Sequence, residues 1–125
     1  MVTEKISTGK NVFIFPMPVT LLGVNVREKA NFMALGWVTR VNANHPMIGC
    51  GIGRHHYTVT GLKKNQTFSI NFPDASIIEK VDCCGLVSGE QVDKSELFSI
   101  FYGELKTAPM ISDCPLCLEY RLFSR

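Results

Sequence analysis

Residues 31–58 read NFMALGWVTRVNANHPMIGCGIGRHHYT, and this stretch decides how the rest of the chain is interpreted. Two runs of strand-forming residues are joined by a polar turn, and a basic segment with two histidines follows them. The first run contains Trp37, the only tryptophan, directly after Gly36. Gly49, Gly51 and Gly53 alternate in the second run, so one face of that strand would carry no side chains and could lie against a flat ligand.

The segment that follows the glycines can bind a phosphate. Arg54 supplies a guanidinium, and nearby hydroxyls and backbone N–H groups could complete the site. A flat ring with a phosphate tail suggests flavin mononucleotide (FMN). The alternatives are a solvated turn for Arg54, His55 and His56 and an ordinary core position for Trp37. His45 is the only other histidine, so we predict no metal site.

Composition limits the class of protein. The 125 residues are 46% apolar and 19% charged, which is ordinary for one globular domain, here residues 1–125. The net charge of +2 is spread along the chain, whereas binding to nucleic acid or a membrane surface needs a concentrated basic face. No apolar run reaches the roughly 20 residues of a membrane span, and MVTEKISTGK at the start contains no apolar signal core. We therefore predict a cytoplasmic protein with neither a nucleic-acid nor a membrane partner.

Most predicted elements are strands. We expect them at residues 12–15, 19–26, 32–41 with a kink at Gly36, 47–53, 67–72 and 116–123. A turn is expected at Glu28, Lys29 and Asn31. Helices are predicted over 57–64 and from an N-cap at Asp74 to residue 83, with a polar loop over 85–94 and an ambiguous segment over 97–101. Short strands with few helices favour an antiparallel barrel or sandwich, and no GxGxxG or P-loop pattern is present.

Six segments occur in the order found in a known family. They read FPMPVTLLGV, NFMALGWVTRV, HPMIGCGIGRHHYT, FSINFP, DCCGLVSGEQVDK and APMISDCPLCLEYRL, and they span most of residues 15–122. On these segments the chain resembles the flavin reductase-like, FMN-binding split-barrel proteins, and among them the flavoredoxin-like group. The resemblance implies a mainly β fold, an antiparallel split β-barrel of Greek-key type with a few short helices.

The resemblance also implies a function. FMN would bind noncovalently near the interface of a homodimer, and the protein would be an oxidoreductase or an electron-transfer flavoprotein. NAD(P)H would be a possible electron donor, and a redox protein or a small molecule the acceptor. The chemistry would take place on the flavin, so no catalytic side chain is predicted. The main alternative is a flavin- or nucleotide-binding module without turnover.

The implied cofactor contacts fall on matched positions. Around the ring they are Asn31, Met33, Leu35, Gly36, Trp37, Val38 and Thr39. Around the phosphate and ribityl chain they are Arg54, His55, His56, Tyr57 and Thr58. Asn71, Phe72 and Lys94 are implied as further contacts. From the residues alone, Lys94 could instead form an exposed ion pair with Asp93.

Family members usually continue past the position of Leu122. The C-terminal part of the usual domain is therefore expected to be missing from this chain. The chain would be a shortened relative, a truncated product, or a subunit whose barrel is completed by a partner.

The cysteines support a further alternative. Their number, five, is odd, so reduced thiols are expected rather than a disulfide framework. Cys114 and Cys117 form a CxxC pair, a spacing found in thiol-redox and zinc proteins. A redox pair normally opens a helix, however, and this one leads into a predicted strand. Zinc needs four ligands, and the only other close pair, Cys83 and Cys84, is adjacent. A cysteine-based redox or metal protein is therefore the less favoured alternative.

Overall fold

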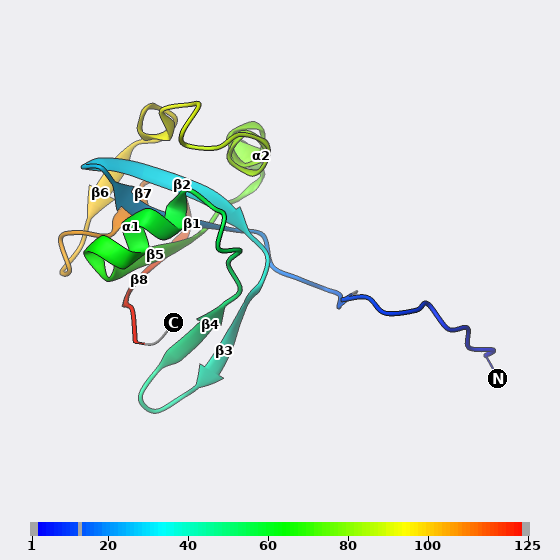
Figure 1. Ribbon diagram of the computed structural model, residues 1–125. Coiled ribbons are helices and arrows are strands. Elements are labelled where there is room, and N and C mark those ends of the chain that lie inside the picture. The colour runs from blue at the N-terminus through cyan, green and yellow to red at the C-terminus, as the bar shows by residue number, and fades with distance from the viewer. Residues whose placement is uncertain (1–2, 13, 124–125) are drawn as a thin grey trace.

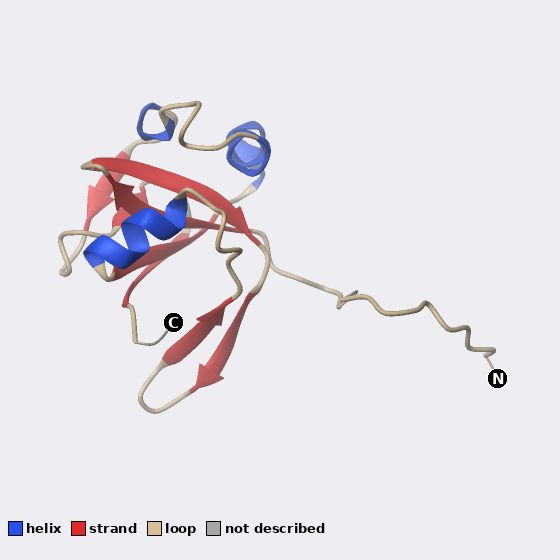
Figure 2. Ribbon diagram, viewed as in Figure 1, coloured by secondary structure: helices blue, strands red, loops and turns tan. Residues whose placement is uncertain are grey.

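The computed structural model describes residues 3–12 and 14–123. The described residues form mainly antiparallel strands with two short α-helices (Figures 1 and 2). In chain order the elements are β1 Thr20–Val26, β2 Lys29–Leu35, β3 Val38–Asn42, β4 Met47–Cys50, α1 Thr58–Asn65, β5 Thr67–Phe72, η1 Ala75–Ile77, α2 Ile78–Leu86, η2 Lys94–Glu96, β6 Ile100–Tyr102, β7 Pro109–Ile111 and β8 Leu116–Arg121. The mainly β, antiparallel prediction is confirmed.

One four-stranded sheet forms the body, in the order β2-β1-β5-β8 with every pair antiparallel. Two separate ribbons, β3–β4 and β6–β7, complete the described strands. Figure 1 shows β3–β4 projecting from the body. The strand predicted over 32–41 is thus wrong as a single element, because the backbone breaks at Gly36 and Trp37 and its two halves pair in different sheets.

The β1–β2 hairpin turns one step earlier than predicted. Val26 pairs with Lys29, so Arg27 and Glu28 form the turn and Asn31 lies within β2. Both turn residues have positive φ, 51° and 68°, as a two-residue turn of type I′ requires. Such a turn matches the right-handed twist of the strands, although neither residue is the glycine or asparagine that usually occupies it.

The remaining boundaries agree closely with expectation in some places and shift in others. The strand over 67–72 is confirmed, and α1 is shifted by one residue. Asp74 caps η1 by accepting a hydrogen bond from the Ser76 amide at 3.0 Å, and α2 follows as far as Leu86. Strand β4 is shorter than predicted, and β8 ends at Arg121. The strand predicted over 12–15 is wrong for Val12, Ile14 and Phe15, which form none, while Phe13 lies outside the described residues.

Strands β1, β2 and β5 of the sheet are largely buried on both faces. Leu21 and Phe32 face α2, where Val81 and Cys84 join the same cluster. On the other face of the sheet, Leu22 and Met33 pack in one cluster with Leu62 of α1. Figure 1 shows the two helices on opposite faces of the sheet. Because neither face of β1 meets water along most of its length, its sequence TLLGVNV is mostly apolar and does not alternate.

A buried polar cluster joins the sheet to β7. Asn71 of β5 donates to the Leu21 carbonyl at 3.0 Å and to the Ser69 hydroxyl at 2.9 Å, and its Oδ1 accepts from the Ile111 amide at 3.1 Å. Asn71 is fully buried. With these partners its amide group is satisfied inside the core, which offsets the cost of burying it.

Candidate functional site

A pocket of about 340 Å³ lies at the hairpin end of β2. Four parts of the chain form its walls: the β1–β2 hairpin, the start of β2, the residue before α1, and the loop that leads into η2. Its lining residues are Val26, Arg27, Lys29, Ala30, Asn31, Tyr57, Gly89, Glu90, Gln91, Val92, Asp93 and Lys94. The pocket brings together three of the predicted contacts, Asn31, Tyr57 and Lys94.

Lys94 is the unusual group in this pocket, because only 3% of it is exposed. Its Nζ donates to the carbonyl oxygens of Phe32, at 3.0 Å, and of Cys84, at 3.2 Å. The Cys84 carbonyl lies in the last turn of α2, where a helix dipole favours a cation. The alternative interpretation of Lys94, an exposed ion pair with Asp93, is therefore wrong. Among the described residues, the only ion pair is Lys29–Asp93, so no carboxylate balances the Lys94 charge.

Burial lowers the pKa of Lys94. The neighbouring Cys84 thiol supplies no negative charge, because burial raises its pKa to about 11. An ammonium has three donors, and the two carbonyls use two of them. Buried charges are normally paired, so this cation is suited to an anionic or strongly accepting group in the pocket.

Asn31 and Gly89 face each other across the pocket wall. Asn31 is buried, and its Nδ2 donates to the Thr58 hydroxyl at 3.1 Å, which links β2 to the first residue of α1. A Cβ at position 89 would collide with Asn31 Oδ1 and lie 2.8 Å from a Tyr57 ring carbon. Only glycine therefore lets the 89–94 loop come this close. Sequence reasoning missed Gly89, and its only local signal is a glycine within a polar loop.

The rim of the pocket carries charges of both signs. Lys29 and Asp93 form an ion pair at 3.1 Å, but the lysine side chain is 69% exposed, so the pair adds little stability. The pKa of Asp93 is lowered, first by the Ser95 hydroxyl and then by Lys29. Asp93 also accepts from the Ser95 amide at 3.0 Å and so caps η2. This cap fixes the residue that precedes Lys94.

A second group of predicted contacts is exposed and lies outside the pocket lining. Trp37 is 58% exposed, and its carbonyl accepts from the Gly51 amide at 2.8 Å across the β3–β4 ribbon. Thr39, Arg54, His55 and His56 are exposed, while Gly36 and Val38 are half-buried. The two imidazoles stack with ring centres 4.5 Å apart. The structure does not join this group to Lys94, and its cofactor role stays a prediction.

A third group lies in the interior. Met33 and Leu35 belong to the core around α1, with half-buried Phe72 packed beside them. Thr58 and Asn71 are buried and hydrogen-bonded as described. Their side chains hold the fold together, so any contact of these five with a cofactor stays a prediction.

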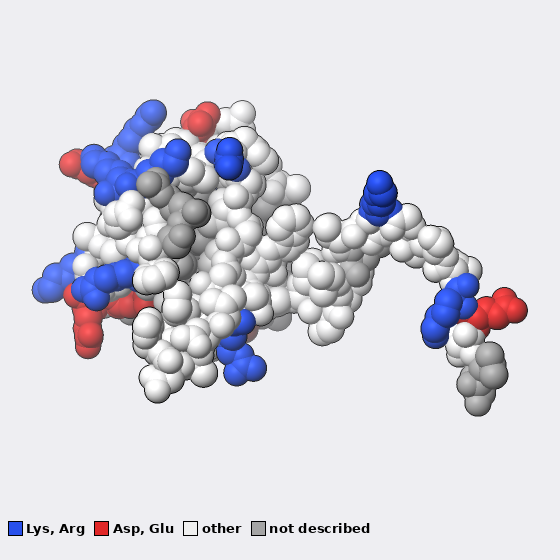
Figure 3. Space-filling model, turned by 60° about the horizontal axis from the view of Figure 1, so that its bottom comes forward, with Lys and Arg blue, Asp and Glu red and all other residues white. Residues whose placement is uncertain are grey.

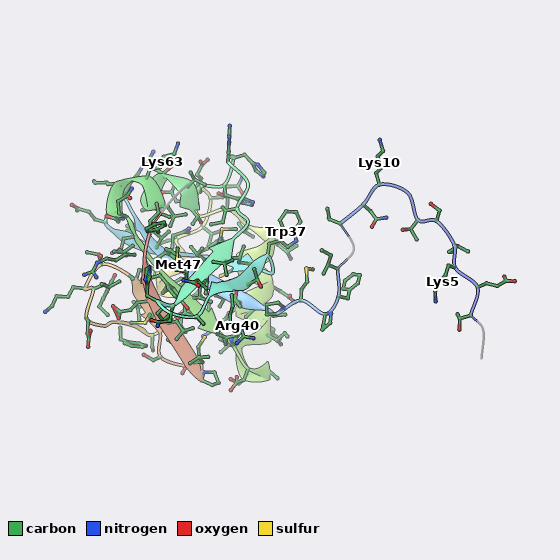
Figure 4. The ribbon with its side chains drawn as sticks, turned by 90° about the horizontal axis from the view of Figure 1, so that it is seen from below. Lys5, Lys10, Trp37, Arg40, Met47 and Lys63 are labelled. Atoms are coloured by element: carbon green, nitrogen blue, oxygen red, sulfur yellow. The ribbon has the colours of Figure 1, made fainter. Side chains whose placement is uncertain are left out.

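A larger groove of about 750 Å³ runs between β4, α1 and β8. Its floor is mainly apolar, and the cations among the described residues that line it are Arg54, Lys63 and Arg121. The lining residues are Leu22, Pro46, Met47, Ile48, Gly49, Cys50, Ile52, Arg54, Val59, Leu62, Lys63, Phe68, Tyr120, Arg121, Leu122 and Phe123. Figure 4 shows Met47 and Lys63, from two of its walls. Arg54 is the only predicted contact in this lining.

A model described as the flavin reductase-like domain matches residues 12–125. The chain belongs to the flavin reductase-like family. The resemblance drawn from the six segments is thereby confirmed.

Solved structures of flavin reductase-like proteins share this fold. The crystal structure of flavoredoxin from Methanosarcina acetivorans is 64% identical with a TM-score of 0.92, over 95% of this chain and 64% of that one. Flavoredoxin of Desulfovibrio vulgaris (Miyazaki F) is 27% identical with a TM-score of 0.90, over 98% and 68%. An FMN-binding protein from Thermus thermophilus is 26% identical with a TM-score of 0.84, over 99% and 70%. The split-barrel prediction is confirmed.

The chain spans just under two thirds of two of its relatives. It covers 64% of the Methanosarcina flavoredoxin. It also covers 63% of an uncharacterized protein from Archaeoglobus fulgidus, to which it is 29% identical over 112 residues.

The pocket around Lys94 fits part of a flavin. Ligand pockets range from about 300 to 1,000 Å³, so 340 Å³ is at the small end and would hold one portion of such a molecule. A planar ring presents carbonyl oxygens and a nitrogen at its polar edge, and Lys94 and Asn31 supply polar groups of the matching kind. The cysteines fit a redox centre less well than the Lys94 pocket fits a flavin.

Cys114 lies in the turn between β7 and β8, and Cys117 is the second residue of β8, so the pair leads into a strand as predicted. Burial raises the pKa of Cys114 to about 12 and also raises that of Cys117, whose thiol donates to the Ile111 carbonyl at 3.2 Å. Both cysteines are free thiols, and thiolate is the form that reacts. Over residues 3–12 and 14–123, no three His, Cys, Asp or Glu side chains gather as a metal site would require. In the same residues, no helix is long and apolar enough to span a membrane.

Proposed function

We propose that this chain binds FMN noncovalently and is an oxidoreductase or electron-transfer protein of the flavoredoxin type, with the Lys94 pocket as part of the flavin site. The observation that carries the proposal is the buried Lys94 ammonium, which lines a pocket and has no carboxylate partner among residues 3–12 and 14–123. Support for FMN comes from similarity to two flavoredoxins and to an FMN-binding protein. Bound flavin would supply the electron transfer itself.

The residues of this chain would bind and tune the cofactor. The Lys94 ammonium would lie near the polar edge of the ring and stabilise negative charge there, while the Phe32 and Cys84 carbonyls hold it in place. Asn31 would offer its Oδ1 from the same wall. Arg54 would bind the phosphate as a charge-assisted donor. We assign no nucleophile and no acid or base among the side chains.

Binding of FMN by the purified full chain tests the site. Titration should show a bound flavin with wild-type protein and an affinity about 10–100-fold lower for Lys94→Met, since a hydrogen bond to a charged group contributes about 1.5–3 kcal/mol. Lys64→Met is the matched control, because Lys64 is an exposed cation that lines neither the Lys94 pocket nor the larger groove. Thermal unfolding of each variant without flavin separates a lost contact from a damaged fold. Equal affinities for Lys94→Met and wild type would remove Lys94 from the site.

Two further measurements address the rest of the proposal. Arg54→Ala should weaken FMN more than riboflavin, which has no phosphate, and an equal effect on both would refute the phosphate assignment. Lys94→Met would remove the cation proposed to lie near the ring. It should therefore lower the midpoint potential of bound FMN, since the anionic reduced flavin loses stabilisation.

Reduction by NADH or NADPH under anaerobic conditions would identify an enzyme that uses these donors. FMN that binds but is reduced only by a protein donor would indicate an electron carrier. Bound FMN that is reduced neither by NADH or NADPH nor by a protein donor would favour the binding module without turnover. We also propose a homodimer located in the cytoplasm.

A further inference from the structure

The larger groove between β4, α1 and β8 shares only Arg54 with the proposed flavin site. Ile48, Cys50 and Ile52 line this groove and are half-buried, so each keeps part of its surface in contact with water. At about 750 Å³ the groove lies in the upper part of the range for ligand sites, which is about 300–1,000 Å³. A ligand that fills the groove would remove this apolar surface from water, which is favourable.

The floor of the groove offers few polar side chains. Apart from the three cations and the weakly accepting sulfur of Met47, the described lining residues carry side-chain donors or acceptors only at Cys50 and Tyr120. The rings of Phe68 and Tyr120 stack with their centres 5.5 Å apart, which gives the floor a flat aromatic section. Burial raises the pKa of Cys50 to about 11, so its thiol is uncharged at neutral pH. An alkyl chain has no hydrogen bonds to satisfy and therefore suits this floor better than a polar ligand does.

Two of the cations lie at the same end of the groove. The Leu122 amide donates to the Gln66 carbonyl at 2.8 Å, which ties the end of β8 to the C-terminal end of α1. Arg121 is the last residue of β8, and Lys63 lies in the last turn of α1. Both side chains are exposed and line the groove. The groove therefore combines an apolar floor with two positive charges at one end.

The charge of the groove is of one sign. Its described lining contains no Asp or Glu. Within residues 3–12 and 14–123 the only ion pair is Lys29–Asp93, so no carboxylate of these residues neutralises Lys63 or Arg121. Figure 3, which brings the bottom of the molecule forward, shows Lys and Arg side chains gathered on one side, beside a mainly uncharged surface. Charge complementarity favours an anion at this end, and a guanidinium fork matches the two oxygens of a carboxylate.

We propose that the larger groove binds a long-chain carboxylate of the fatty-acid class, with its alkyl chain on the apolar floor and its carboxylate between Lys63 and Arg121. This inference goes beyond flavin binding and does not depend on it. Arg54 is assigned to the FMN phosphate, so the variants that test the groove leave Arg54 unchanged.

Calorimetric titration of the flavin-free full chain with dodecanoate, kept below its micelle concentration, tests the proposal. Dodecanoate should bind about 15-fold more tightly than decanoate, because each buried CH₂ gains roughly a factor of four in affinity. Lys63→Met with Arg121→Met should weaken dodecanoate binding about tenfold, since each exposed ion pair contributes a few-fold, and should leave dodecanol binding unchanged. Lys64→Met with Arg40→Met is the matched control, because both cations are exposed and lie outside the groove lining. This control should bind dodecanoate as wild type does.

Four results would overturn the proposal. Wild-type protein that does not bind dodecanoate has no such site. Equal losses in the two double variants would mean that net charge alone attracts the anion. Equal losses of dodecanoate and dodecanol would mean that the two cations do not bind the carboxylate. Complete displacement of dodecanoate by added FMN would assign the groove to the flavin.

Methyl NMR of the flavin-free wild-type protein locates the bound chain. Dodecanoate should shift the methyl signals of Ile48, Ile52 and Leu62, which line the groove, while those of Ile77 and Ile111 in the core cluster around α2 should not move. Shifts concentrated in the α2 cluster would place the chain elsewhere and overturn the proposal. Because dodecanoate binding is measured without flavin, its failure would leave the FMN titration result unaffected.

Discussion

Replacing Gly61 with alanine should destabilise the protein, although alanine is the better helix former. Gly61 lies in the middle of α1, where the helix crosses β1. A Cβ at this position would collide with the Asn25 carbonyl oxygen and lie 2.9 Å from Val26 Cγ2. The obstacle is backbone in the central sheet, so a rotamer change cannot relieve it.

Two opposing effects set the size of the change. Alanine in a helix interior gains about 1 kcal/mol over glycine, whereas overpacking a tight contact costs about 1–3 kcal/mol. With a backbone atom as the obstacle, we expect a cost near the upper end and a net loss of about 1–2 kcal/mol.

Urea unfolding followed by circular dichroism measures this loss, provided that the m-value is unchanged. Gly85→Ala in α2 is the matched control, because its Cβ would make only an ordinary 3.5 Å contact with Ala34 Cβ. That variant should be as stable as wild type or gain up to about 1 kcal/mol. If Gly61→Ala proved as stable as Gly85→Ala, the close approach of α1 to β1 would be refuted.

Three further predictions concern the rest of the fold. Asn71→Ala should lower the free energy of unfolding by about 2–4 kcal/mol, because it leaves the buried Leu21 carbonyl and Ile111 amide without this hydrogen-bond partner. A loss below about 0.5 kcal/mol in urea unfolding would contradict the polar cluster. Burial raises the pKa of Cys114 from 9.0 to about 12, so the folded state keeps that proton longer than the unfolded state does. The stability difference between wild type and Cys114→Ala should therefore favour wild type most below about pH 8.5 and shrink as the pH rises toward 12; a difference that stays constant with pH argues against this. Arg27→Asn with Glu28→Gly should raise the melting temperature by a few degrees, equivalent to about 0.5–1 kcal/mol, because Asn-Gly suits a type I′ turn at φ of 51° and 68°; a lower melting temperature would mean that Arg27 or Glu28 makes a stabilising contact.

The sequence was most informative where local pattern and packing coincide. Apart from Asn25 and Asn71, the runs that became β1 and β5 are apolar or small, which is typical of strands buried on both faces. The break at Gly36 and Trp37 was beyond local reasoning, because a kink and a change of sheet differ only in the distant strands that each half pairs with.

The candidate site also depends on contacts between residues far apart in the sequence, which local patterns do not predict. Lysine is almost never buried, and Lys94 is buried only because tertiary folding brings carbonyls of β2 and α2 to its Nζ. Family resemblance, rather than local chemistry, pointed to this residue. Gly89 was missed because its need for a small side chain comes from Asn31, far away in the sequence.

The separate β3–β4 ribbon has a consequence for dynamics. Two-stranded hairpins are marginally stable alone, and this one contacts the core mainly through Val38, Ile48 and Cys50. Its amide hydrogens should therefore exchange with solvent through local opening, while those of β1, bonded to strands on both sides, should exchange only when the whole domain unfolds. The predicted ring-lining residues Trp37 to Thr39 would then lie in the part of the protein that a bound ligand orders most. Slower exchange of the amide hydrogens there would report ligand binding even if the four-stranded sheet did not move.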